Sequence, residues 1–289
     1  MINYLKKKLK NIMGIEELNE KIDNNIFLNG KILIESNLKN YSKSIEKQNV
    51  KVFSQSGEDG IIQYIVSKIN TKNKKFVEFG CEKYSESNTR YLLFNNNWSG
   101  LIIDGSQKNI REIKKSYYYW KHDLTAINEF IKKDNIESII KKYNFHKNLG
   151  LLSIDIDGND YWILNELKDL EPDIIICEYN SLLGMNDSIT LKYDEKFQRS
   201  EKDYGKINYG ASIKAITKLL SDNYILVSGN SFGNNIFFVN KKYEHLFETK
   251  TIEECYVEIG FNELINIETE KKTFSEKKKL IDTSKFEHV

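Results

Sequence analysis

The sequence predicts an α/β fold in which a seven-stranded, mostly parallel sheet with one antiparallel edge strand carries helices on both faces. Between residues 51 and 240, short apolar runs alternate with segments of helical spacing, which is the pattern of strands joined by crossover helices. Several of the apolar runs end in acidic residues, and open α/β sheets bind their ligands at the carboxyl ends of such strands. The last two apolar runs are separated by a short linker rich in glycine and asparagine, which favours an antiparallel hairpin.

The apolar runs and the helical spacing give the expected order of elements. We expect strands at residues 76–79, 101–103, 151–156, 174–177, 224–227 and 236–239, with a weaker third strand at 117–120. Helices are expected at residues 60–69, 88–94, 108–115, 127–132, 161–167 and 212–220.

The chain divides into three parts: residues 1–50, 51–245 and 246–289. The first is lysine- and asparagine-rich with helical apolar spacing, and we expect a helical arm that packs on the domain or forms a homo-oligomer. An alternative is electrostatic attachment to an anionic membrane surface through Lys6, Lys7, Lys8 and Lys10. The last part is charged, and we expect one or two peripheral helices followed by fraying.

Composition limits the classes of function. The chain of 289 residues has 43 Lys and Arg against 42 Asp and Glu, a net charge of +1, which gives no argument for a nucleic-acid partner. Its three cysteines show no C-x-x-C spacing, so we expect a reducing, cytoplasmic location and no zinc site. The N-terminus lacks the apolar region of a signal peptide, and no apolar run is long enough to span a membrane.

The run 151–156 ends in an acidic cluster that a core strand does not need. Asp155 lies near the end of this run, and Asp157 and Asp160 follow it, so that three acids fall within six positions. Buried carboxylates without partners are costly. A metal ion, a cationic cofactor or a substrate proton would neutralise or use them.

A second set of motifs predicts a nucleoside site. Glu78 and Gly80 end the first strand, and glycine there lets a ligand approach the backbone. Asp104 and Gly105 end the second strand, with Asp104 24 positions after Gly80, and an acid at this place binds ribose hydroxyls. Asp123 follows the expected third strand and is our candidate partner for an adenine amino group. The lone glycine does not make a dinucleotide-binding loop.

These motifs together resemble the class I S-adenosylmethionine-dependent methyltransferases, and among them the FkbM-type sugar O-methyltransferases. The resemblance covers residues 51–240 and is carried by the segments 53–59, 77–80, 103–105, 153–160, 176–180 and 209–212. It implies a Rossmann-like fold, S-adenosylmethionine as cofactor and a carbohydrate substrate, free or nucleotide-linked, in capsule or other surface polysaccharide biosynthesis.

The resemblance also implies roles for individual residues. Glu78 and Gly80 would flank the methionine part of the cofactor, with Gln55 and Ser56 near its amino-acid group. Asp104 would bind the ribose, Asp123 the adenine, and Asp155 would lie under the sulfonium.

The acceptor side has three interpretations. Deprotonation of a hydroxyl needs a base or a metal, and Asp157, Asp160, Glu178 and Asn180 are oxygen ligands of the kind that Mg²⁺ prefers. A metal-free site would use Asp157 or His122 as base, and the third interpretation is a structural cluster that caps the next helix. The long loop 181–209 contains Tyr193, Tyr204 and Tyr209, which are candidates for sugar contacts.

Two other functional classes remain as alternatives. A nicotinamide-dependent oxidoreductase is disfavoured because its pyrophosphate would be repelled by Glu78, Asp155 and Asp157. A non-catalytic binding protein that keeps the fold is disfavoured because it has no need of costly acids.

Overall fold

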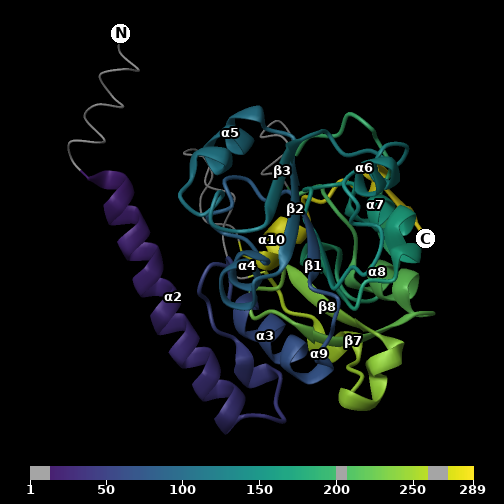
Figure 1. Ribbon diagram of the computed structural model, residues 1–289. Coiled ribbons are helices and arrows are strands. Elements are labelled where there is room, and N and C mark those ends of the chain that lie inside the picture. The colour runs from purple at the N-terminus through teal and green to yellow at the C-terminus, as the bar shows by residue number, and fades with distance from the viewer. Residues whose placement is uncertain (1–13, 200–206, 260–272) are drawn as a thin grey trace.

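The computed structural model describes residues 14–199, 207–259 and 273–289, and its centre is a seven-stranded sheet (Figure 1). The strand order is β3-β2-β1-β4-β5-β8-β7. The strands are β1 (Lys75–Phe79), β2 (Ser99–Asp104), β3 (Leu124–Asn128), β4 (Leu151–Ile154), β5 (Ile174–Glu178), β7 (Tyr224–Gly229) and β8 (Asn235–Asn240). The order runs outward from β1 in one direction and from β4 in the other, so the chain reverses its winding direction between these two strands.

The predicted Rossmann-like α/β fold is confirmed. Strands β1 to β5 pair in parallel, and β8 is antiparallel to both β5 and β7. The glycine- and asparagine-rich linker forms the predicted hairpin, but β8 folds back to lie inside, next to β5, and β7 takes the edge. The antiparallel strand is therefore second from the edge.

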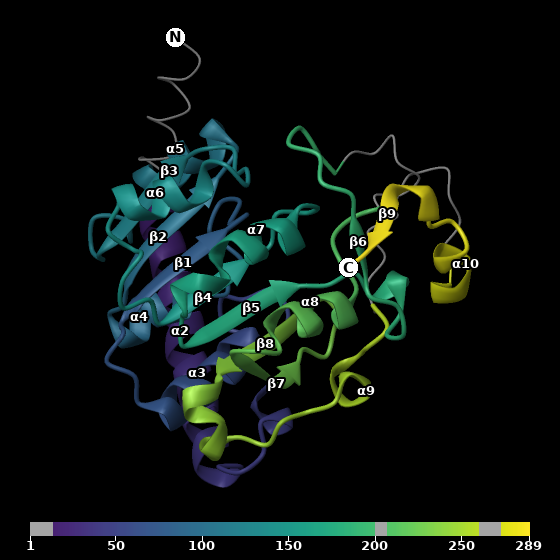
Figure 2. The ribbon, with the colours of Figure 1, turned by 90° about the vertical axis from the view of Figure 1, so that its right-hand side faces the viewer.

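Helices cover the sheet on both faces (Figure 2). One apolar core joins one face of the sheet to α6 (Ile136–Lys142), α7 (Asp160–Leu167) and α8 (Ile213–Leu220). The other joins the opposite face to α3 (Glu58–Ile69), α4 (Arg90–Asn96) and α5 (Gln107–Lys115). The remaining helices are α2 (Ile15–Asn40), α9 (Ile252–Cys255) and α10 (Phe274–Lys278), with short 3-10 turns at Glu46–Gln48, Lys168–Leu170, Ser181–Leu183, Lys241–Leu246 and Thr283–Lys285.

Local sequence explains where several helices begin. The hydroxyls of Ser106 and Ser212 accept hydrogen bonds from the third residues of α5 and α8. Thr251 starts α9 with a reciprocal capping box. These caps satisfy backbone N–H groups that have no partner within the helix.

The third strand lies elsewhere than expected. Residues 117–120 form turns, and the strand is β3, at Leu124–Asn128. The expected helix at 127–132 was also wrong, because β3 ends at Asn128 and α6 begins at Ile136. The aromatic residues Tyr117 and Tyr118 mimic a strand, but they pack on Asp23 and around Arg90 instead.

The C-terminal part is ordered at its end, so the prediction of fraying there was wrong. β9 (Phe286–His288) pairs antiparallel with β6 (Ile189–Leu191), which lies in the long segment after β5. Phe286 packs with Leu183 and Leu191 in a small separate core. The C-terminal strand therefore holds down a loop that borders the carboxyl edge of the main sheet.

In the described part of the N-terminal arm, the main element is α2, a helix of 26 residues. Phe27 and Ile34 pack against Val52, Phe53 and neighbouring aromatic rings. Asp23 forms an ion pair with the almost fully buried Arg90, which joins α2 to α4. Lys6, Lys7, Lys8 and Lys10 lie outside the described residues. Across the described ranges, no helix combines the length and the apolar composition needed to cross a membrane.

Candidate functional site

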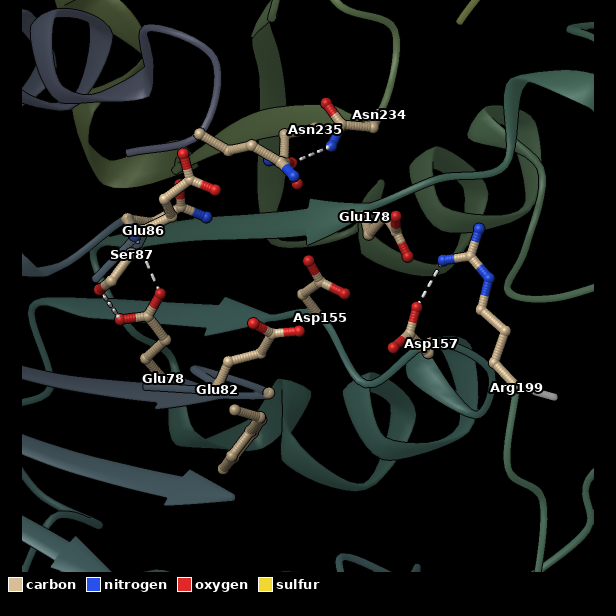
Figure 3. A pocket seen from close by; sticks show the side chains of 14 residues that line it. Glu78, Glu82, Glu86, Ser87, Asp155, Asp157, Glu178, Arg199, Asn234 and Asn235 are labelled. Carbon is tan, nitrogen blue, oxygen red and sulfur yellow. Dashed lines mark hydrogen bonds and ion pairs between the residues drawn. The ribbon is translucent and has the colours of Figure 1, made fainter. Parts of the chain in front are cut away.

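A cavity of about 400 Å³ opens at the carboxyl ends of β1, β4 and β5 (Figure 3). The switch in winding direction between β1 and β4 leaves a crevice at this edge, which is where open α/β sheets bind ligands. The cavity is lined by Gln55, Glu78, Phe79, Gly80, Glu82, Glu86, Ser87, Asn88, Asp155, Asp157, Glu178, Arg199, Asn234 and Asn235. Six of these carry carboxyl groups and one, Arg199, a guanidinium, so the described lining is predominantly acidic.

Three carboxylates meet at the ends of β4 and β5. One oxygen each from Asp155, Asp157 and Glu178 lies within 4.8 Å of the others. Burial, followed by repulsion from neighbouring acids, raises the pKa of Asp155 and of Glu178 well above the ordinary carboxyl range. Arg199 opposes part of this rise because its positive charge favours the ionised forms.

Glu178 stands out within this group. Its side chain is buried, and its Oε2 atom accepts no hydrogen bond from any described residue. Figure 3 shows the carboxyl group pointing into the cavity from the end of β5. A buried acceptor without a partner costs free energy, so this carboxyl group is a candidate to carry a proton or to bind a ligand at the cavity that it lines.

Arg199 is a site residue that our sequence reasoning missed. Its guanidinium pairs with Asp157 and stacks on the ring of Tyr209, 3.7 Å from the ring centre. It comes from the long loop after β5, which the sequence did mark as a candidate, but an arginine there has no motif of its own. Tyr193 lies away from the cavity, against Trp162 and Lys133, and Tyr204 lies outside the described residues.

Glu78 lines the cavity but is fully engaged with its own chain. Its carboxylate accepts hydrogen bonds from the hydroxyls of Ser87 and Thr89 and from the backbone N–H of Asn88. Burial raises the pKa of Glu78, and these hydrogen bonds oppose the rise. Glu78 therefore shapes the loop between β1 and α4, which forms one wall of the cavity.

Gly80 lines the cavity, and a contact within the chain also requires a glycine at this position. It has φ +70°, and a Cβ atom on it would lie 1.5 Å from the carbonyl oxygen of Asp155. The space beside Gly80 is thus filled by the end of β4. The glycine lets the two strand ends touch, and this contact fixes the position of Asp155.

Gln55 and Ser56 lie in the loop before α3. Gln55 lines the cavity and accepts a hydrogen bond from the Asn234 amide. Ser56 is buried, and its backbone N–H donates to Glu58. Gln55 is therefore the member of this pair that reaches the cavity.

Asp104 and Gly105 end β2 at the same edge of the sheet. Asp104 is buried, and its Oδ1 accepts hydrogen bonds from Ser106 N at 2.7 Å and Asn109 Nδ2 at 3.2 Å. Beyond β3, the exposed ring of Phe130 lies beside Gly105, 3.5 Å from where a Cβ atom would stand. These residues lie beyond the cavity lining, in the direction of β2 and β3.

The structure does not bring His122 and Asp123 to the site. Both precede β3 and lie at the amino edge of the sheet, where Asp123 accepts a hydrogen bond from the Ser99 hydroxyl. The His122 ring stacks on Phe94 at 4.7 Å. Burial and the nearby Lys121 and Arg90 lower the pKa of His122. The misplaced third strand caused this error, because a residue that seemed to follow a strand in fact precedes one.

Asp160 and Asn180 are also used by the fold. The Asp160 carboxylate accepts hydrogen bonds from the backbone N–H groups of Ile156 and Gly158, both at 2.8 Å, and burial raises its pKa to about 6. The Asn180 amide donates to the carbonyls of Ile207 and Tyr209 and accepts from Leu182 N. Neither residue lines the cavity, so the two do not fit the metal-ligand set expected from the sequence.

Comparison with known proteins gives structural likeness only. No protein-family model and no curated protein matches the sequence. Among solved structures, the chain is similar to the SAH-bound methyltransferase PaMTH1 of Podospora anserina, with 11% identity over 75% of this chain and 88% of that one, TM-score 0.43. The SAH-bound N-terminal domain of EvdMO1 has 10% identity over 63% and 80%, TM-score 0.42.

A third similar structure is an S-adenosylmethionine-dependent methyltransferase of Clostridium acetobutylicum, with 13% identity over 72% of this chain and 96% of that one, TM-score 0.39. At these low identities and TM-scores, the function of this chain has to be inferred from its own cavity.

Proposed function

We propose that the chain is an S-adenosylmethionine-dependent O-methyltransferase that acts on a sugar or sugar-derived intermediate of surface polysaccharide biosynthesis. The observation that carries the proposal is the group of Asp155, Asp157 and Glu178, whose carboxyl oxygens converge at the cavity and which includes a buried Glu178 oxygen without a described partner. The methyl donor and its charge follow from this group. The sugar and the polysaccharide pathway follow only from the sequence motifs.

The charge of the cavity selects among cofactors of the α/β folds. Opposite charges a few ångströms apart attract strongly at a partly buried site, and like charges repel equally strongly. A sulfonium carries one positive charge and fits beside Asp155. A pyrophosphate would have to lie against the carboxylates that line this wall, which argues against a nicotinamide cofactor.

The residues present fit the parts of S-adenosylmethionine from one end of the crevice to the other. Asp104 would accept the ribose hydroxyls with Oδ2, because its Oδ1 is already engaged by Ser106 and Asn109. Gln55 would contact the amino-acid end. The adenine would lie toward the end of β3, beside Gly105 and the exposed ring of Phe130, rather than at Asp123.

Asp155 and Glu178 are the candidate general bases. Bound S-adenosylmethionine supplies an electrophilic methyl group, and the electron pair of the broken carbon–sulfur bond stays on sulfur. As the acceptor oxygen attacks, its proton passes to a carboxylate, and a carboxylate with a raised pKa is a more effective base near neutral pH. Asp157 is less suited because Arg199 pairs with it, and His122 lies at the other edge of the sheet.

Arg199 and Tyr209 form the acceptor side of the proposed site. The arginine pairs with Asp157 and lies over the tyrosine ring, so the loop brings a polar and aromatic surface next to the carboxylates. An acceptor hydroxyl held against this surface would meet the methyl donor in line, and such alignment of two reactants lowers the barrier by roughly 7–11 kcal/mol.

Mg²⁺ is the alternative means of activating the acceptor. Asp155, Asp157 and Glu178 are the residues that would hold it, because their oxygens converge and Glu178 Oε2 has no described partner. A bound divalent cation would lower the pKa of a coordinated hydroxyl. Dialysis against EDTA separates the two mechanisms: activity that survives it assigns the proton to a carboxylate, and activity restored only by Mg²⁺ assigns it to a metal.

Calorimetry with S-adenosylmethionine and S-adenosylhomocysteine tests the cofactor assignment. We expect both to bind, and Asp155→Asn to weaken the cationic donor more than the neutral product, because only the donor carries the charge that Asp155 faces. Glu244→Gln, in the 3-10 turn after β8, is the matched control and should bind both normally. Binding of NAD or NADP instead, or of none of the four, would contradict the proposal.

A second experiment addresses the acceptor. The protein is incubated with S-adenosylmethionine and a panel of free and nucleotide-linked sugars, and mass spectrometry follows the gain of one CH₂ group. We expect a gain on the sugar part that withstands mild base, because a methyl ether resists conditions that hydrolyse a methyl ester. Methylation of an amine or a carboxylate in the same panel would contradict the hydroxyl acceptor while leaving the cofactor assignment intact.

A further inference from the structure

The outer face of α2 is the largest feature of the fold that the proposed function does not use. Figure 1 shows α2 as a long rod along one side of the domain. Its inner face packs through Phe27, Ile34 and Leu38. Six large aliphatic side chains on the helix are exposed, with Ile32 the most exposed at 65%. They are Leu18, Ile22, Ile26, Leu28, Ile32 and Leu33.

The exposed residues form one continuous surface. At about 100° per residue, Leu18, Ile22, Asn25, Asn29 and Ile32 fall on a stripe opposite the buried residues. Their spacing of four, three, four and three positions is the repeat by which one helix packs along another. A surface of this kind costs free energy in water and marks an interaction site when it is contiguous.

The stripe is complementary to itself in the antiparallel direction. When two copies of α2 meet about a two-fold axis at the level of residue 27, positions equally far from the axis lie side by side. Ile22 then faces Ile32 of the second copy, five positions on either side, and Asn25 faces Asn29, two positions on either side. In this central part of the stripe apolar side chains thus meet apolar ones, and amides meet amides that can exchange hydrogen bonds, while Leu18 at the end of the stripe faces Ser36.

The flanks of the stripe agree with the same arrangement. On one flank Leu28 meets Leu28 of the second copy. On the same flank, Lys21 of each copy lies beside Glu35 of the other copy, once at each end of the paired helices. On the other flank Ile26 meets Ile26. In the single chain Lys21 pairs with Glu17 and Lys31 with Glu35, but these partners are exposed, and exposed side chains exchange partners at little cost.

We propose that two copies of this chain form a two-fold symmetric dimer by antiparallel pairing of the outer faces of α2. A two-fold interface must bring a surface against itself, and α2 satisfies this condition in shape, polarity and charge at once. The ion pair of Asp23 with Arg90 and the packing of Phe27 hold the helix on its own domain. The dimer therefore joins two complete domains, and none of the described residues that line the cavity belongs to α2.

Sedimentation velocity of the full-length protein over a range of concentrations tests the proposal. We expect the wild type to sediment as a dimer and Ile32→Asp to sediment as a monomer. For Leu28→Asp we expect the dimer dissociation constant to rise at least tenfold. Because these side chains are exposed in the single chain, the circular dichroism should stay at the wild-type value. The melting temperature should equal that of the wild type diluted below its dimer dissociation constant, because only the contribution of the dimer to stability is lost. A wild type that is monomeric throughout, or a dimer that keeps its affinity with Ile32→Asp, would overturn the proposal.

A charge exchange tests the antiparallel direction. Lys21→Glu and Glu35→Lys should each weaken the dimer, because each brings like charges together at two symmetric places, and the double variant should restore it. Lys108→Glu on α5 is the matched control and should leave the dimer unchanged. A double variant as weak as either single one would overturn the antiparallel pairing.

A membrane is the competing occupant of this face. We expect no cosedimentation of the protein with vesicles that contain anionic lipid. A monomer that does cosediment, and loses this property in Ile32→Asp, would overturn the dimer and assign the face to a lipid surface.

Discussion

The two ends of β5 carry buried carboxylates with opposite surroundings. Asp173 precedes the strand at the amino edge, and its oxygens are bound by Thr71, Asn73, Tyr243 and Lys242. Glu178 ends the same strand at the carboxyl edge, and its Oε2 has no described hydrogen-bond partner. The two acids lie five residues apart, one just before β5 and one at its end, yet one is part of a closed network and the other faces a cavity.

The difference separates acids that hold the fold from acids that are kept for a ligand. A buried carboxylate surrounded by donors is stabilised relative to an unpartnered one, and removing it leaves those donors unsatisfied. A buried carboxylate without donors destabilises the fold, and a chain retains it where its charge or its proton is used. The same distinction applies to Asp160 and Asp155. The Asp160 carboxylate accepts hydrogen bonds from two backbone N–H groups, whereas Asp155 lines the cavity.

Removal of the closed network should have the largest effect on stability. Asp173→Ala leaves the ammonium of Lys242 and two hydroxyls without their acceptor, and we expect a loss of about 3 kcal/mol in the free energy of unfolding. Urea denaturation measures it. Affinity for S-adenosylhomocysteine should be unchanged in the folded variant, and a large loss of affinity would show that the two ends of β5 are not independent.

Gly80→Ala should disturb the cavity end of the sheet by a somewhat smaller amount. The new methyl group meets the Asp155 carbonyl and φ is positive, so we expect a loss of about 2–3 kcal/mol, together with weaker cofactor binding. Gly14→Ala is the matched control, because Gly14 has φ +61° with nothing within 4 Å, and should lose only about 1 kcal/mol. Equal losses in the two variants would show that the contact with Asp155 is unimportant.

Glu178→Gln should change stability little and in the opposite direction. An amide cannot ionise at this unpartnered buried position, and we expect the free energy of unfolding to stay the same or rise by about 1 kcal/mol. Methyl transfer should fall by about 100-fold, within the usual range for loss of a general base. Wild-type turnover in this variant would leave Asp155 as the base.

The smallest expected effect is the difference between the wild type and Glu178→Gln in how the melting temperature depends on pH. Because the pKa of Glu178 is raised in the folded protein, folding is favoured by its protonation. That contribution is complete below the ordinary carboxyl pKa of about 4.3 and is lost as pH rises through the raised value. The melting temperature of the wild type should therefore fall more steeply above about pH 4.3 than that of Glu178→Gln. Parallel curves would mean that Glu178 does not titrate in the folded protein.

Predictions from the sequence were most successful for elements that are determined by a local pattern of side chains. The apolar runs of β1, β2, β4, β5, β7 and β8 and the hairpin linker are readable because burial on both faces demands continuous hydrophobic strands. Asp155, Asp157 and Glu178 could be selected as site residues because each lies at or just after the end of an apolar run. The third strand failed because Tyr117 and Tyr118 have strand-like composition but surround Arg90 and α2, a contact between distant parts of the chain.

The roles of individual site residues depended on contacts that no spacing reveals. Asp160 and Asn180 have the residue types of metal ligands, but the backbone groups that they bind are placed by the turn of the chain. Gly80 was correctly marked as special, yet the space that it leaves is occupied by Asp155. The likeness of the two β5 acids in sequence gave no sign that one is surrounded by donors and the other is not.

The sequence by itself determined the layered α/β architecture and the crowding of acids at one rim, because both arise from side-chain order along single strands. Only the tertiary structure decided which of those acids are already bound by the chain, which loop brings Arg199 to them, and which face of α2 stays in water. Hydrogen-bond partners and exposure depend on segments far apart along the chain, and these acquire their neighbours only when the sheet is assembled.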